Sequence, residues 1–319
     1  MRTYVQFLTG FVLIAGLSIF ASAQITPQRS NFPPSEKLLS RRYGSGEKLS
    51  YRMNATNQDR HGTLRYEIQA DGVVKKNAAG QFVEEFGWSN LVVNEKPTPL
   101  SAASSNFRQP LSLSPGYTLS IPNLSQVDPI LIGPITDLLT FYADMTIAAG
   151  QGNLTHPGDH FYFKHGAPNS WADGNYALIG EDSIDFDVTL TDLNTADKIA
   201  TIEVRHVPPA QPEVKLPAAW MRAPVADTPN NWVEVTKNFA SKSAADKYVA
   251  SVGKETFDVQ IKVSLVNGQM ISGHIDNPLE VLERDCADEA LTTCGDPVRY
   301  KSEGKSKFGD PQDDKKINC

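Results

Sequence analysis

The feature that most constrains the fold of this 319-residue chain is a recurring alternation of apolar and polar residues. It begins at Lys48 and resumes after a turn near residues 59–62. Successive side chains of an extended strand point to opposite faces of a sheet, so this period of two predicts β-strands that bury one face. The apolar positions of the first two runs are Leu49, Tyr51, Met53, Ala55, Leu64, Tyr66, Ile68 and Ala70.

Further alternating runs extend the same pattern. A third run covers residues 82–88 and follows turns predicted at Asp71–Gly72 and Ala79–Gly80. A hairpin is predicted from residues 183–192 and 198–206. The sequence therefore predicts a mainly β protein, with an antiparallel curved sheet or a half-open barrel.

One helix is expected in the body of the chain. Between residues 134 and 149, apolar residues recur every three or four positions, which is typical of a helix that buries one face. We expect this helix to pack on the sheet.

The C-terminal hairpin, Phe257–Ile275, is the clearest local signal, and we expect it to join the sheet late. A three-residue loop with Gly268 in the left-handed conformation would set Val263 opposite Ile271. A two-residue Asn-Gly turn would set Val263 opposite Met270 instead. We prefer the first register because it gathers the apolar side chains on one face.

Prolines, glycines and polar stretches suggest boundaries between these parts. We expect a signal peptide at residues 1–23, an N-terminal arm at 24–46, a main β domain at 47–206, a proline-rich connector at 207–229, a β segment at 230–300 docked on the main domain, and a disordered tail at 301–319.

The N-terminus has the pattern of an export signal. Arg2 precedes a mostly apolar run from Tyr4 to Phe20, and the small residues Ala21, Ser22 and Ala23 suit cleavage after Ala23. The alternative is a retained membrane anchor, but a polar segment with prolines follows, without a basic stop-transfer flank. We expect a secreted or periplasmic protein with no transmembrane span after cleavage.

The three cysteines all lie near the C-terminus, at Cys286, Cys294 and Cys319. In an oxidising compartment, Cys286 and Cys294 would close a short loop. We predict this disulfide, while Cys319 is left with an unassigned partner.

The first strand also carries a resemblance. The segment Gly46–Met53 is similar to the first strand of exported bacterial proteins of unknown function with half-barrel folds, whose concave face sometimes holds an apolar ligand. The resemblance brings no site residues with it. The candidate ligand-binding residues come from the alternating strands themselves and are Tyr51, Tyr66, Phe86 and Trp88. Our first hypothesis is a non-catalytic protein that binds an apolar small molecule or an envelope protein partner.

A histidine cluster supports an enzymatic alternative. His156, Asp159 and His160 could hold zinc in an exported hydrolase, because imidazole and carboxylate groups suit that ion. His165 would point to the opposite face of a strand from His160 and could not share the ion. We favour histidines of a turn and a strand edge without a metal as the explanation of the cluster, and we expect no cofactor.

A second group of carboxylates could hold calcium, which prefers six to eight oxygen ligands. A solvated strand face explains two of its members, Asp185 and Asp187, without an ion. The group consists of Glu181, Asp182, Asp185 and Asp187.

Tryptophans in loop-like surroundings allow a third hypothesis, carbohydrate binding, because sugars stack on exposed rings. These are Trp171, Trp220 and Trp232. No nucleophile-elbow, zinc-protease or phosphate-loop motif is present, although a triad that includes His206 could assemble only in the fold. The formal net charge of -7 disfavours nucleic acid as a partner.

Overall fold

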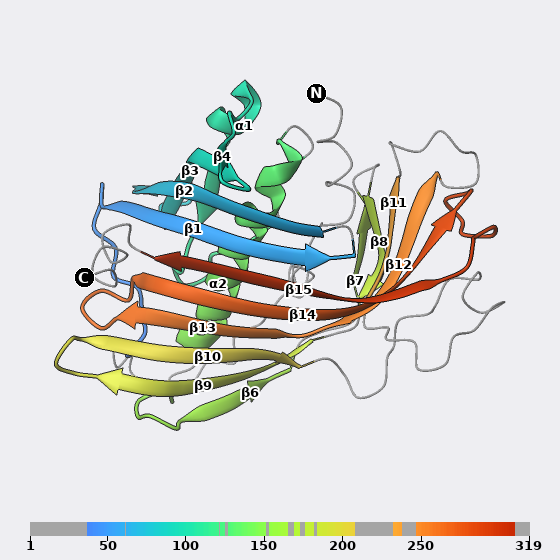
Figure 1. Cartoon of the computed structure of the whole chain (residues 1–319). Helices are drawn as coiled ribbons and strands as arrows, with labels where there is room; N and C mark the ends of the chain where they lie inside the picture. The colour runs from blue at the N-terminus through green and yellow to red at the C-terminus, as the bar shows by residue number, and fades with distance from the viewer. Residues whose placement is uncertain are drawn as a thin grey trace.

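The protein folds as one open antiparallel sheet with a long helix packed on it (Figure 1), which confirms the predicted fold class. The computed structural model describes residues 37–309, apart from 61, 121, 125–126, 151–152, 165–168, 173–175, 182–183, 208–231 and 238–246.

The strands and helices follow one another in this order. The strands are β1 (Lys48–Asp59), β2 (Gly62–Lys76), β3 (Phe82–Val93), β4 (Lys96–Pro97), β5 (Gln109–Leu111), β6 (His160–Phe163), β7 (Asn169–Ala172), β8 (Tyr176–Glu181), β9 (Asp185–Asn194), β10 (Ile199–Val207), β11 (Trp232–Lys237), β12 (Tyr248–Glu255), β13 (Phe257–Ser264), β14 (Met270–Cys286) and β15 (Val298–Gly309). The helices are α1 (Ala102–Asn106), the 3-10 turn η2 (Pro129–Leu131) and α2 (Ile132–Gly150).

The sheet divides at β14. On one side, β14 pairs with β15, which continues to β1, β2 and β3. On the other side, its first half pairs with β13 and its second half with β12. Strands β1–β3, β15, β13, β10, β9 and β6, with the first half of β14, form what we call the half-barrel. Strands β7, β8, β11 and β12, with the second half of β14, form the distal wing, which stands apart at the right of Figure 1.

The core of the half-barrel lies between its inner face and α2. The predicted alternation is observed: Tyr51, Met53 and Ile68 are at most 2% exposed, while their neighbours along each strand face outward. The predicted helix is confirmed, and most of its side chains are buried, whichever way they point. By length and composition alone, residues 129–150 could cross a membrane, but 72% of their most apolar stretch is buried inside the protein, as in a core helix.

The C-terminal third of the chain occupies the centre of this sheet. The predicted disordered tail is wrong for residues 301–309, because these residues belong to β15, which pairs with β1 and β14. Alternate residues of β15 are buried, including Phe308 at 3% exposed. The segment predicted to dock on the main domain completes its sheet, because β1 is connected to β10 through β15, β14 and β13. The connector lies almost wholly outside the described residues, as does the rest of the tail.

The C-terminal hairpin combines the two registers that the sequence allows. Val259 faces Ile275, as the three-residue loop requires, and Gly268 is left-handed with φ 69°. A β-bulge between Lys262 and Val263 then sets Val263 opposite Met270. The prediction that Ile271 faces Val263 is therefore wrong, because the bulge shifts the pairing of the two strands between Val259 and Val263.

The N-terminal arm, described from residue 37, packs against this hairpin. The Arg42 side chain donates hydrogen bonds to the carbonyl oxygens of Leu265 and Val266, at 3.0 and 2.9 Å. A Cβ on Gly268 would lie 2.2 Å from the carbonyl oxygen of Ser40. Gly268 is thus required twice, for its left-handed backbone and for the close approach of the arm.

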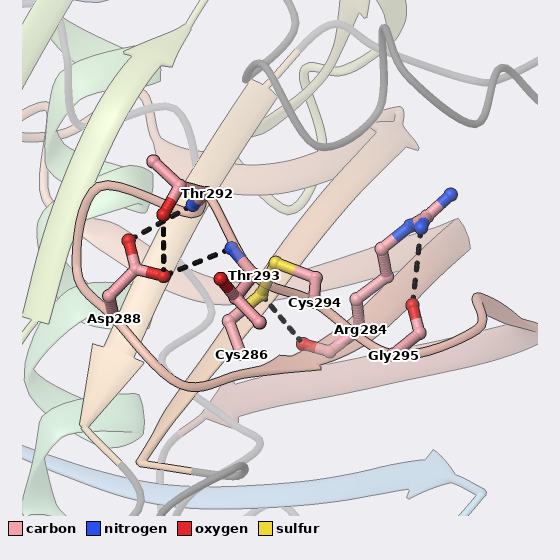
Figure 2. Close-up of a disulfide and its surroundings, with 7 residues drawn as sticks. All are labelled: Arg284, Cys286, Asp288, Thr292, Thr293, Cys294 and Gly295. Carbon is pink, nitrogen blue, oxygen red and sulfur yellow. Dashed lines mark hydrogen bonds between the residues drawn. A yellow bond between two sulfur atoms is a disulfide. The ribbon is translucent and has the colours of Figure 1, made fainter.

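The predicted disulfide joins Cys286 at the end of β14 to Cys294, with the two Cα atoms 4.1 Å apart. Figure 2 shows Asp288 inside the loop, where its carboxylate accepts hydrogen bonds from Thr292 and from the backbone N–H of Thr293. The sulfurs pack in a small apolar cluster of the distal wing, separate from the main core. This cluster contains Ala250, Val252, Leu282, Cys286 and Leu291.

Candidate functional site

The rings predicted to bind a ligand belong to the core of the half-barrel. Tyr51, Tyr66, Phe86 and Trp88 are 2%, 4%, 0% and 3% exposed. Helix α2 packs against the face that they share, so none of them presents a ring to the surface. This placement corrects the prediction: alternation identified the buried face, and we had interpreted that face as an open concave surface.

One strand residue on the same face is a buried carboxylate. Glu84 is 2% exposed, and its Oε1 accepts a hydrogen bond of 2.9 Å from Nε of Arg41 in the N-terminal arm. The hydroxyl of Tyr142 on α2 donates to its other oxygen. Burial raises the pKa of Glu84 to about 7, although Arg41 opposes the shift. The cluster links the arm, β3 and α2. Because it is buried, holding these three segments together is a better explanation of the cluster than catalysis.

A second buried pair resembles part of a catalytic triad. His206 on β10 places Nε2 3.0 Å from both carboxylate oxygens of Asp144 on α2. The two residues are 3% and 0% exposed, and the rings of Phe186 and Phe257 pack against the imidazole. Within the described chain, the other ring nitrogen has no hydrogen-bond partner. Because the pair is buried and no nucleophile in the described chain is hydrogen-bonded to that nitrogen, its role is to fix α2 to the sheet.

The residues predicted to bind zinc form a surface turn. Asp159 accepts hydrogen bonds from the backbone N–H groups of Thr155 and His156, both at 2.8 Å, which lowers the pKa of its carboxyl group. His156 Nδ1 lies 3.7 Å from Asp159 Oδ2, and His160 is exposed on β6. No group of three potential metal ligands occurs among the described residues. The geometry is that of a side-chain-capped turn.

The other predicted sites lie partly or wholly outside the described residues. Asp185 and Asp187 occupy the outward positions of β9, while Asp182 and the side chain of Glu181 are not described. For the proposed sugar-binding rings, Trp171 lies in β7 and Trp232 in β11, but their side chains and all of Trp220 are not described. The calcium and carbohydrate predictions therefore stay predictions.

A groove of about 630 Å³ lies on the outer face of the half-barrel, over β1, β2 and β3. The strand register places its lining side chains in two parallel rows. Lys48, Val73 and Glu85 face one another across the three strands in the first row. Ser50, Asp71 and Gly87 do so in the second. Its volume falls in the range of small-molecule pockets, roughly 300–1,000 Å³.

The wall of the groove comes from the segment at the C-terminal end of α1. Arg108 lies directly over Gly87, where an added Cβ would be 3.2 Å from its Nη1 atom. That nitrogen donates hydrogen bonds to the carbonyl oxygens of Ser105 and Phe107, at 3.0 and 2.8 Å. A side chain at position 87 would therefore displace Arg108 or fill the groove.

Sequence reasoning missed this groove for two reasons. Asp71–Gly72 was predicted to be a turn but lies in the middle of β2, which corrects that prediction. Only the apolar face of these strands was considered as a ligand-binding surface. Gly87, a glycine at an outward position between two large inward rings, was the available signal, because such a glycine often marks the close approach of another group.

A scan against protein-family models found no family that matches this chain, and a search of the curated proteins found no relative.

Proposed function

We propose that the protein is exported and acts without catalysis, by binding a partner in the groove over β1, β2 and β3. The observation that carries this proposal is the groove itself, a concavity lined by charged and hydroxyl side chains on a rigid sheet. The concave face expected to hold an apolar ligand is covered by α2, so a protein partner is the better-supported half of the original hypothesis.

Catalysis lacks a suitable constellation in the described part of the chain. The Asp144–His206 pair is buried, and the turn at His156 and Asp159 brings together no third ligand for a metal. Export is supported by the signal-like segment at residues 1–23 and by the Cys286–Cys294 disulfide, which suits an oxidising compartment.

A groove-filling variant tests the proposal. The mature protein, whose N-terminal residue should be Gln24, is screened against peptide and glycan arrays beside Gly87→Leu. Gln260→Leu serves as control, because Gln260 is also exposed on an outer strand face but lies on β13. We expect Gly87→Leu to remove at least about 90% of the specific signal and Gln260→Leu to leave it, since filling a pocket excludes its ligand.

Two results would contradict this proposal. Ligands that bind the Gly87→Leu variant as well as the wild type would place the site elsewhere. A precursor that keeps residues 1–23 and remains inside the cell would contradict export.

A further inference from the structure

We propose that the groove receives an acidic peptide segment of the partner, with a carboxylate of that segment bound by Arg108 and Lys48. This inference rests on the proposed function and adds the chemistry of the partner.

The first support is the pairing of the cations on this face. Arg52 lies 2.7 Å from Glu67, and Lys75 lies 2.6 Å from Glu85, so these charges are neutralised within the sheet. Lys48 and Arg108 line the groove without an acidic partner at ion-pair distance among the described residues. The lining also holds two carboxylates, Glu85, which is paired with Lys75, and Asp71. Two cations against one remaining carboxylate leave a net positive charge, which favours an anionic ligand.

The second support is the way Arg108 is held. Its Nη1 atom is occupied by the carbonyl oxygens of Ser105 and Phe107. The guanidinium is thereby held over Gly87, and its other N–H groups have no hydrogen-bond partner among the described residues. A fixed guanidinium binds a carboxylate with less loss of side-chain entropy than a mobile one.

The third support is the lining, which fits a peptide better than a sugar or a lipid. Asp71 accepts hydrogen bonds from Ser50 and Gln69, and its carboxylate oxygens can also accept from the backbone N–H groups of an extended segment. Val73, 39% exposed, is the one lining residue among the exposed large apolar residues of the described chain. Trp88, at 3% exposed, offers no ring face for a sugar.

The test uses two synthetic peptides that differ only in charge, Gly-Ser-Glu-Ser-Glu-Ser-Gly and the same peptide with Gln in place of Glu. Binding to the full mature protein is measured by fluorescence anisotropy. We expect the Glu peptide to bind at least about tenfold more tightly, because a carboxylate–guanidinium hydrogen bond is charge-assisted.

Matched variants locate the effect. Arg108→Ala and Lys48→Ala should each weaken binding of the Glu peptide by about tenfold, while Arg108→Lys should keep part of the affinity. Arg52→Ala is the control, since it removes the same charge from the same outer face but outside the groove lining. Thermal melts monitored by circular dichroism should show that all four variants remain folded.

The outcomes separate the two proposals. Equal binding of both peptides, or an equal loss with Arg52→Ala, would overturn the acidic-partner inference. If Gly87→Leu abolished binding of the peptides in either case, the groove would remain the binding site. Failure of the wild type to bind either peptide would also overturn the inference, and the array experiment would then decide on the groove itself.

Discussion

The half-barrel and the distal wing share β14 but are stabilised by different means. The half-barrel wraps one long helix and buries a large continuous core. The described cluster of the distal wing has few apolar side chains and is closed by the Cys286–Cys294 disulfide. The covalent link stabilises the distal wing by restricting its unfolded chain, a contribution that does not depend on the size of the core.

Polar groups differ between the two regions as well. In the half-barrel, Asp137, Tyr142 and Asp144 on α2 bind Tyr66, Glu84 and His206 on three different strands. A buried charge or hydroxyl is costly without its partner, so these contacts set the position of α2 along the sheet. In the distal wing, the carboxylate of Asp288 instead organises the loop that the disulfide closes (Figure 2).

The largest expected effect is in the half-barrel core. Phe141 on α2 is fully buried and packs edge-on against Phe308 at 4.6 Å between ring centres. We expect Phe141→Ala to lower the free energy of unfolding by about 3–5 kcal/mol, because it leaves a cavity. Urea denaturation followed by circular dichroism measures this. Thr146→Ala on the exposed side of α2 should change it by less than about 0.5 kcal/mol, and equal losses would contradict our account of the core.

The second effect is a pH dependence confined to the half-barrel. Burial raises the pKa of Asp137 to about 6, and hydrogen bonding to Tyr66 opposes the shift. The folded state then holds a proton that the unfolded state has lost, so the free energy of unfolding should fall as pH rises from about 4 to about 6. Across this range the loss from Asp137 should be roughly 3 kcal/mol.

The control for this pH dependence is Asp137→Asn, which should reduce the slope between pH 4 and 6. The contribution of Glu84, whose pKa is raised to about 7, should remain and extend the decline to about pH 7. Stability that instead rises with pH over this range in the wild type would contradict the assignment.

The third effect tests the distal wing. Replacing both Cys286 and Cys294 by Ala should cost about 2.5 kcal/mol in the chain-entropy model. The loss should be local, so native-state hydrogen exchange should accelerate in β12 and in the second half of β14 but not in β1 or β2. A reducing agent should then have no further effect on the double variant. Equal acceleration in both regions would show that the two regions unfold as one unit.

How far the sequence predicted the fold can be followed along single strands. Alternation located β1, β2 and β3, and it separated Tyr51 and Met53 from their outward neighbours, because period two is a local property of an extended chain. The same argument failed for β15, whose composition of Lys, Ser and Gly suggested disorder. Pairing on both sides supplies its stability, and a partner distant in sequence leaves no local signal.

The candidate site was harder to predict than the fold. The rings chosen as ligand contacts were correctly grouped on one face, but whether a face is open depends on what packs against it. Arg108 and Gly87 meet because β3 and the segment after α1 lie side by side, and nothing in the spacing of these residues indicates that contact.

By itself, the sequence determined the strands with clear alternation, the helix α2, the disulfide and the side of those strands that avoids water, since these follow from short-range spacing and from the chemistry of single residues. Tertiary structure alone decided that β14 divides the sheet, that α2 covers the concave face and that a groove remains on the outer one. These features depend on contacts between distant segments, whose free energy belongs to the assembled molecule.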